Sequence, residues 1–365
     1  MCIKVEMLAA AEGDALLVTL EGDEPRMLLV DAGRDATGKY LASRFNDAKP
    51  TKIDLMVVTH IDRDHIEGVL SLLERCDREA LQIDEIWFNG YRHLNTASRG
   101  IVQQGAQMGN RLEKAILERH IPWNVSFKDA PVGWIHGVFI TKEFGSGSRV
   151  TVLGPEAFYL QRLREVWGEE CGYANLVEGV SPRDNACVMA AQGGVAPFDL
   201  DSLATSRWTD DFSVPNRSSI SLLIEHGGRS LLLAGDTTSP QLIKAYTKLR
   251  DERRTDIHRG SLGQLDALKL PHHGCSKNLS RELLKTIEAR AYLVSSSGAF
   301  FYHPNDETLA RIICHHRNEG LEIPEIYFNY RSSITAPWAE PARGANVLYR
   351  PVFGEAPNGV TWRPQ

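Results

Sequence analysis

The feature that most constrains the fold is a turn that joins an apolar strand to a helix and is crowded with ligand-type side chains. Residues 53–59 (I-D-L-M-V-V-T) form a short apolar run that is typical of a buried strand. Residues 64–75 carry apolar side chains at helical spacing, at Ile66, Val69, Leu70 and Leu73. Between these elements stands T-H-I-D-R-D-H, with two histidines and two aspartates. The polar cluster therefore begins where a strand ends.

The remaining chain alternates strands with helices that would cover them, which predicts a layered α/β fold. We expect a single domain over residues 1–365, with an insertion at about 90–215 and a C-terminal extension at about 320–365. Further strands are predicted at 3–8, 15–20, 27–30, 83–88, 137–141, 150–153, 219–226, 230–236, 267–270 and 291–295. Further helices are predicted at 102–119, 156–167, 240–249, 281–287 and 306–316.

The composition excludes several classes of protein. The 41 Lys and Arg residues against 47 Asp and Glu give a net charge of -6, so no global basic field indicates a nucleic-acid partner, although a local basic groove stays open. No run of eighteen apolar residues and no signal-peptide pattern occurs, so we expect a soluble, cytoplasmic protein without membrane insertion. The six cysteines have no C-x-x-C spacing, which indicates reduced thiols rather than disulfides or a structural zinc site.

Polar motifs follow four of the apolar strands, and side-by-side strands would bring them to one edge of a sheet. Imidazole and carboxylate groups are suitable ligands for zinc, manganese or iron. Two such ions about 3.5–4 Å apart can share a hydroxide and stabilise a hydrolytic transition state. The motifs are V-D-A-G at Asp31, T-H-I-D-R-D-H at His60 to His65, L-L-L-A-G-D at Asp236, and L-K-L-P-H-H-G at His272 and His273.

Each motif also has a structural interpretation. V-D-A-G and L-A-G-D taken alone are typical of turns. The H-x-D-x-D-H turn is more specific, because a purely structural use of these groups would bury costly unpaired polar atoms. The four motifs together therefore favour a metal site.

At these motifs the sequence resembles the metallo-β-lactamase superfamily, whose hallmark turn is H-x-H-x-D-H. It is most similar to the soluble hydrolase domain of ComEC-type DNA-uptake proteins, in which the second histidine is also an aspartate. The resemblance covers residues 1 to about 75 and 216 to about 315. Its other motifs are A-A-E-G-D-A at Gly13 to Ala15, N-R-S-S-I-S-L at Asn216 and Ser219, P-H-H-G-C-S, and S-G-A-F-F-Y-H-P at His303.

The resemblance implies an αββα sandwich with the site along one edge. His60 and Asp62 would bind a first metal, and Asp64, His65 and His272 a second, with Asp236 bridging both. His273 ranks next as a ligand, because the H-H pair leaves open which ring turns inward. Asp31 would orient a ligand histidine, and His303 would hold or protonate the leaving group. Catalysis is thus expected to depend on Asp64, His303 and Asp31.

One departure from the superfamily pattern affects the first metal. The superfamily supplies a separate histidine between the turn motif and the bridging aspartate, whereas this chain offers Asn216 and Ser219 there. We therefore expect the first metal to bind weakly or to exchange. Because carboxylate-rich sites favour harder ions, Mn²⁺ is as plausible as Zn²⁺ for the two sites.

The leading hypothesis is a metal-dependent phosphodiesterase or nuclease that acts on DNA or RNA through a hydroxide shared by two metals. The alternatives are a hydrolase of a small ester (a phosphorylcholine-type ester, a cyclic nucleotide or a lactone) and a metal-bound regulatory or scaffold subunit whose insertion binds a partner protein. Basic groups at Arg92 to Arg99 and Arg250 to Arg254 are candidates for phosphate contacts, with solvated surface as their default interpretation.

Overall fold

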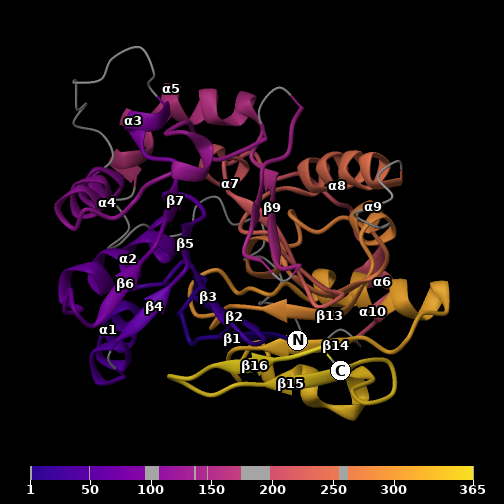
Figure 1. The fold of residues 1–365 in the computed structure, drawn as a ribbon. Helices are drawn as coiled ribbons and strands as arrows, with labels where there is room; N and C mark the ends of the chain where they lie inside the picture. The colour runs from indigo at the N-terminus through magenta and orange to yellow at the C-terminus, as the bar shows by residue number, and fades with distance from the viewer. Residues whose placement is uncertain are drawn as a thin grey trace.

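The computed structural model describes residues 2–48, 50–94, 107–134, 137–145, 147–173, 198–254 and 262–364. Two large β-sheets lie between two groups of helices (Figure 1). In the view of Figure 1, the indigo and purple helices of the N-terminal half lie on one side and the orange helices of the C-terminal half on the other. The protein is therefore a mixed α/β sandwich, as the sequence predicts.

The first sheet has six strands in the order β16-β1-β2-β3-β5-β7. The pairs from β16 to β3 are antiparallel, whereas β3, β5 and β7 run parallel to one another. A separate parallel pair is formed by β4 (Thr51–Ile53) and β6 (Leu81–Ile83). In the sequence, these strands come directly before β5 and β7. The six strands are β1 (Cys2–Met7), β2 (Leu16–Glu21), β3 (Arg26–Val30), β5 (Leu55–Val58), β7 (Ile86–Phe88) and β16 (Val360–Trp362).

The second sheet has eight strands in the order β15-β14-β13-β12-β11-β10-β9-β8. Strands β11 to β15 are parallel, and β8 to β11 are joined by antiparallel pairs. The strands are β8 (Thr141–Glu143), β9 (Arg149–Gly154), β10 (Ser221–His226), β11 (Arg229–Leu233), β12 (Leu265–Lys269), β13 (Ala289–Val294), β14 (Glu325–Phe328) and β15 (Arg350–Phe353).

Side-chain alternation along the strands divides the core into three layers. Val57 of β5 and Leu231 of β11 belong to a cluster that contains side chains of both sheets and lies between them. Their neighbours Met56 and Leu232 belong to two other clusters, each shared with the helices outside one sheet. Because successive strand residues point to opposite faces, both sheets are buried on both sides. This layering is the αββα arrangement expected from the sequence.

Helices cover the outer face of each sheet. Those whose apolar side chains join the first sheet's outer cluster are α1 (Asp35–Asp47), α2 (Arg63–Arg75), α4 (Gln107–Glu118) and α5 (Ala157–Tyr173). Those that cover the second sheet are α8 (Ser239–Arg254), α9 (Arg281–Thr286) and α10 (Asp306–Glu319). The other α-helices of the described residues are short, namely α3 (Tyr91–Leu94), α6 (Leu200–Thr205) and α7 (Val214–Arg217).

Helix α1 is absent from the sequence prediction. It buries few large apolar side chains, among them Leu41 and Phe45, and it carries a glycine in its second turn. A Cβ at Gly38 would lie 2.2 Å from the carbonyl oxygen of Gly68, so this glycine permits a close crossing of α1 and α2. The helix is thus fixed by a tertiary contact that its own periodicity does not reveal.

The segments predicted as an insertion and as a C-terminal extension contribute strands to both sheets. Strands β8 and β9 come from the segment predicted as an insertion, and they extend the second sheet beyond β10. The C-terminal residues supply β14 and β15 to the second sheet, and β16 pairs with β1 in the first. The part of residues 102–119 that precedes Gln107 lies outside the described residues. Within the described part of the chain, no helix has the length and apolar character needed to cross a membrane.

Candidate metal centre

The turn between β5 and α2 supplies four side chains to the centre. His60 comes two residues after the end of β5, and its buried Nε2 lies 3.5 Å from Asp62 Oδ2. Asp62 occupies the N-cap position of α2 but makes no side-chain capping hydrogen bond, so its carboxylate is directed elsewhere. Asp64 and His65 belong to the first turn of the helix, where His65 is fully buried. A short strand-to-helix connection thereby gathers all four ligand-type groups.

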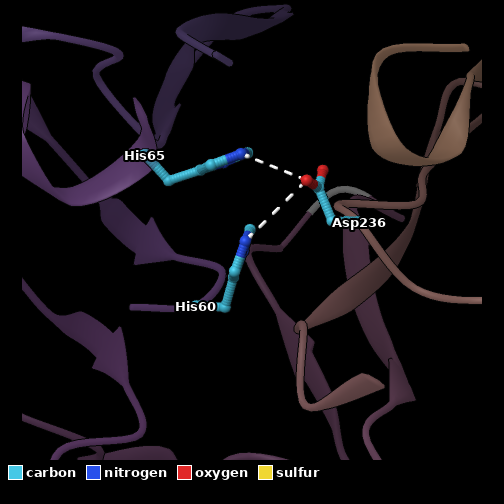
Figure 2. Close-up of side chains that lie close together, drawn as sticks. All are labelled: His60, His65 and Asp236. Atoms are coloured by element: carbon cyan, nitrogen blue, oxygen red, sulfur yellow. Dashed lines mark ion pairs between the residues drawn. The ribbon is translucent and has the colours of Figure 1, made fainter. Parts of the chain in front are cut away.

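Asp236, which follows β11 from the other half of the chain, faces this turn. Its Oδ2 lies 3.8 Å from His60 Nε2 and 3.5 Å from His65 Nε2, as Figure 2 shows. The same oxygen lies 3.4 Å from His273 Nε2 and 3.9 Å from His272 Nε2. One carboxylate oxygen therefore stands among four imidazoles.

In the described residues the ligand-type atoms form four overlapping groups of three, two of which include Asp14. His60, His65 and Asp236 make one, and Asp64, His65 and His273 make another; within each group all ligand atoms lie within 4.8 Å of one another. His60 Nε2 and Asp236 Oδ1 are buried and have no hydrogen-bond partner. Buried polar atoms in proteins are normally satisfied. Coordination to a divalent cation would therefore satisfy both of these unpaired atoms.

Asp31 holds the His65 ring in the orientation that a metal ligand needs. Its Oδ2 lies 2.7 Å from His65 Nδ1, and Thr59 donates to both Asp31 oxygens, from its backbone N–H at 2.8 Å and its hydroxyl at 2.7 Å. With Nδ1 engaged by the carboxylate, Nε2 is left to face Asp236. The orienting role expected for Asp31 thus has the matching geometry.

The two consecutive histidines after β12 point to different surroundings. Both have left-handed backbone conformations, with φ of 46° at His272 and 56° at His273. His273 is buried with Nε2 3.5 Å from Asp64 Oδ2, and its Nδ1 lies 2.9 Å from the Ser295 carbonyl oxygen. The His272 side chain is 24% exposed. His273 thus lies beside Asp64 and His65, in the position for which His272 was predicted ahead of His273.

The ring of His272 is held by a polar cluster. Its Nδ1 lies 3.3 Å from Asp211 Oδ2 and 3.1 Å from Asn278 Oδ1. Both Asn216, at 2.7 Å, and Asn278, at 3.1 Å, donate to the same oxygen of Asp211. Asn216, which stands where the superfamily pattern supplies a histidine to the first metal, therefore contacts Asp211 and, at 3.3 Å, the Nδ1 atom of His272.

The electrostatics of the centre are those of a site that requires positive charge. Burial would raise the pKa of Asp64 and Asp236, but the neighbouring imidazoles hold both pKa values below their usual range. Burial would lower the pKa of His273, yet Asp236 and Asp14 raise it to about 10. The pKa of His65 is also raised, chiefly by Asp236 against the effect of burial. The carboxylates thus stay ionised and favour positive charge on the groups beside them.

The remaining predicted residues lie around this centre. His303 is 6% exposed, its ring centroid lies 5.4 Å from that of His272, and its Nδ1 has no hydrogen-bond partner. The Ser219 hydroxyl oxygen accepts a hydrogen bond of 3.0 Å from the backbone N–H of Asp236 and thereby helps to fix that residue. The hydroxyl oxygen of Ser297, in the loop that leads to His303, accepts a 3.3 Å hydrogen bond from the Ala299 N–H.

The basic groups proposed for phosphate binding are only partly described. Arg253 of α8 is buried and pairs with Glu225 of β10. Its charge therefore belongs to an ion pair between this helix and the second sheet. Arg92 is exposed, with its guanidinium 5.3 Å from the Trp123 ring centroid. Residues 95–99 of the other basic segment lie outside the described residues.

Sequence reasoning missed a buried ion pair behind His273. Asp14 and Lys269 contact each other with almost no exposure, and Asp14 Oδ1 lies 3.2 Å from His273 Nδ1. The signal in the sequence was the G-D-A turn, for which no role of Asp14 was predicted.

No role was predicted for Cys275 either. Burial would raise the pKa of its thiol, but His272 and His303 hold this pKa well below the usual value. No local pattern links this cysteine to the distant His303.

Comparison with solved structures finds likenesses of low similarity. The metallo-β-lactamase fold protein YhfI from Bacillus subtilis is 11% identical over 99% of each chain, with a TM-score of 0.43. A diphosphatase from the PhnP family is 12% identical over 100% of this chain and 97% of that chain, with a TM-score of 0.40. The diiron β-hydroxylase CmlA from Streptomyces venezuelae is 14% identical over 88% of this chain and 51% of its own, with a TM-score of 0.40. No protein-family model and no curated protein matches the sequence.

Proposed function

We propose that the protein is a metal-dependent phosphodiesterase that holds two divalent ions and cleaves single-stranded DNA or RNA. The observation that carries this proposal is the position of Asp236, whose one carboxylate oxygen faces the Nε2 atoms of His60, His65 and His273 within 3.8 Å. A bridging carboxylate between two ligand groups suits a pair of ions rather than a single one. The ComEC-type resemblance of the motifs adds nucleic acid as the substrate class.

The residues divide between two sites that share Asp236. His60 and Asp62 would hold the first ion, and Asp64, His65 and His273 the second, with Asp31 keeping the His65 ring in place. The first site has the more exposed ligand, since the Asp62 side chain is 40% exposed, so this ion would exchange more readily. The chemistry that two divalent ions supply is polarisation of the phosphate and activation of water at neutral pH.

His303 is proposed to act on the leaving group. Its buried ring lies beside that of His272, and its Nδ1 is not engaged by another protein group. An imidazole so placed can hold or donate a proton to the departing oxygen. The choice of metal follows from the ligands: the carboxylates at Asp62, Asp64 and Asp236 suit Mn²⁺, and the imidazoles suit Zn²⁺ equally.

The test combines metal content with a substrate panel. Elemental analysis of protein purified without chelator should approach two transition-metal ions per chain, with one ion lost first on dialysis. The loaded protein should cleave labelled single strands, and Asp64→Asn, which keeps the side-chain shape, should reduce the rate by at least about 10–100-fold. Metal-free protein that gains nothing from zinc or manganese would refute the proposal. Rapid turnover of a cyclic nucleotide, phosphorylcholine ester or lactone without strand cleavage would establish the small-ester alternative instead.

A further inference from the structure

The loop between β13 and α10 displays three consecutive aromatic side chains to solvent. Phe300, Phe301 and Tyr302 are 59%, 42% and 49% exposed. Exposing one large apolar side chain is common, but three adjacent aromatic rings form a patch whose exposure needs an explanation. Because this loop leads directly into His303, the patch lies next to the metal centre.

The loop that carries these rings is tied to the sandwich. The Ser297 N–H donates to the Ala11 carbonyl at 2.7 Å, and the Ser296 N–H donates to Asn329 Oδ1 at 2.9 Å. Gly298 has φ of 74°, and a Cβ there would lie 2.6 Å from Ile334. The backbone before the aromatic residues is thus fixed by contacts on two sides, which reduces the entropy lost when a ligand binds the rings.

Ring contacts connect the patch to the centre. Phe301 stacks on His303 with centroids 6.1 Å apart and an interplanar angle of 25°. His303 in turn contacts His272, whose Nε2 lies 3.9 Å from Asp236 Oδ2. A substrate whose scissile group reaches Asp236 therefore has its neighbouring group within reach of the aromatic patch.

A fourth exposed aromatic ring, that of Phe212, is linked to His272 through Asp211. Phe212 is 76% exposed, and the Arg217 guanidinium lies 4.7 Å from its ring centroid. Its neighbour Asp211 contacts the His272 ring at Nδ1. His272 is thus linked to exposed aromatic groups through both His303 and Asp211.

We propose that Phe300, Phe301 and Tyr302 form a stacking platform for the bases of a single-stranded nucleic acid, next to the cleaved phosphate. This inference rests on the proposed phosphodiesterase function and names how its substrate is held. The chain carries a net charge of -6, and the centre is rich in carboxylates, so long-range attraction of a polyanion is weak. Stacking on aromatic faces supplies affinity that does not depend on phosphate contacts and tolerates any base.

The platform is tested by comparing strands with and without bases. Binding of labelled single-stranded DNA is measured by fluorescence anisotropy with the full chain in an Asp64→Asn background, which keeps the strand intact, with Mn²⁺ in the buffer. Replacement by Phe300→Ala should weaken binding about fivefold or more, the factor expected for one lost base–aromatic contact. Phe300→Trp, which keeps a stacking face, should retain binding. Ile323→Ala removes another exposed apolar side chain, at 43% exposure, and should change nothing.

An abasic strand of the same length decides between bases and other contacts. Its affinity should be low and insensitive to Phe300→Ala, because it has no rings to stack. Equal losses for the normal and abasic strands, or no loss for the normal strand, would overturn the platform. Hydrolysis of bis(p-nitrophenyl) phosphate by the unsubstituted protein tests the phosphodiesterase proposal separately. A platform that fails while this diester is cleaved leaves the proposed function standing; strand binding without diester cleavage contradicts the proposed function alone.

Discussion

At the scale of single residues, His303 offers the sharpest kinetic test. It touches no member of the two proposed ligand groups in the described contacts, and its ring lies between Phe301 and His272. A group that acts mainly in the transition state changes kcat more than KM. We expect His303→Ala to lower kcat on single strands by about 100-fold or more, the usual contribution of a positioned acid, and to change KM much less.

Two measurements keep this prediction specific. Metal content of His303→Ala should equal that of the unsubstituted protein, because His303 is not a proposed ligand. The matched control is His315→Ala, which removes a histidine of α10 and should leave kcat unchanged. A rise in KM at constant kcat would show that His303 binds substrate without serving the leaving group.

A second residue-scale prediction concerns His93, which has no part in the centre. The side chain is 4% exposed and packs edge-on against Trp123 with centroids 4.2 Å apart. Burial, assisted by Arg92, lowers its pKa to about 4. The unfolded chain, with a histidine pKa of about 6.5, therefore binds the proton more readily than the folded protein below that pH, and stability falls as pH falls from about 6.5 toward 4.

The expected size of this effect follows from the two pKa values. Lowering the pH from 7 to 5 should cost about 2 kcal/mol of unfolding free energy through His93 alone. Replacing the ring by His93→Gln removes this linkage. Urea unfolding at both pH values should therefore show a smaller pH dependence for the variant, and an unchanged dependence would contradict the assignment.

At the scale of elements, the centre depends on how closely turns approach one another. The turn between β1 and β2 passes against the first turn of α2 at Gly13, where a Cβ would lie 1.7 Å from the carbonyl oxygen of Asp64. Any side chain at this position must displace the turn that carries the proposed ligands. This contact therefore couples a glycine of the first hairpin to the geometry of Asp64 and His65.

We expect Gly13→Ala to destabilise the protein by about 1–3 kcal/mol, as overpacking usually does, and to lower its metal content. The control is Gly263→Ala, since a Cβ at Gly263 meets nothing within 4 Å. Thermal melts and elemental analysis of both variants make the comparison. Normal metal content in Gly13→Ala would mean that the turn moves without disturbing the ligands.

At the scale of the whole molecule, the two halves are joined by buried charges as well as by apolar contacts. Asp14 comes from the β1–β2 turn and Lys269 from β12 of the second sheet, and the pair is fully enclosed. Removing one partner leaves the other charge buried and unpaired, which costs about 3–5 kcal/mol. We expect a loss of this size in Lys269→Met, measured by urea unfolding.

The double variant distinguishes charge from packing. Asp14→Asn combined with Lys269→Met removes both charges of this pair and should recover part of the lost stability, although it also removes the carboxylate beside His273. The exposed Lys285 provides the control, because Lys285→Met removes a lysine from the surface of α9. Equal losses for the single and double variants would indicate that packing around Lys269, and not its charge, stabilises the junction.

The sequence alone was sufficient for the features that local periodicity encodes. The apolar run at residues 53–59 and the helical spacing from Asp64 predicted β5 and α2, and polar residues at strand ends predicted that His60, His65 and Asp236 would meet. These predictions hold because side chains alternate along a strand, repeat every 3.6 residues along a helix, and converge at an edge when strands pair. The layered α/β fold follows from the same rules.

Only the tertiary structure decided features that depend on partners distant in the sequence. Helix α1 is stabilised by its close crossing with α2 at Gly38 and Gly68, which its weak periodicity does not indicate. The choice between His272 and His273 was set by two left-handed backbone residues that turn adjacent rings apart, one toward Asp64 and one toward Asp211. Neighbouring histidines are equivalent as letters, and only the carboxylates that the fold brings to each ring make them different.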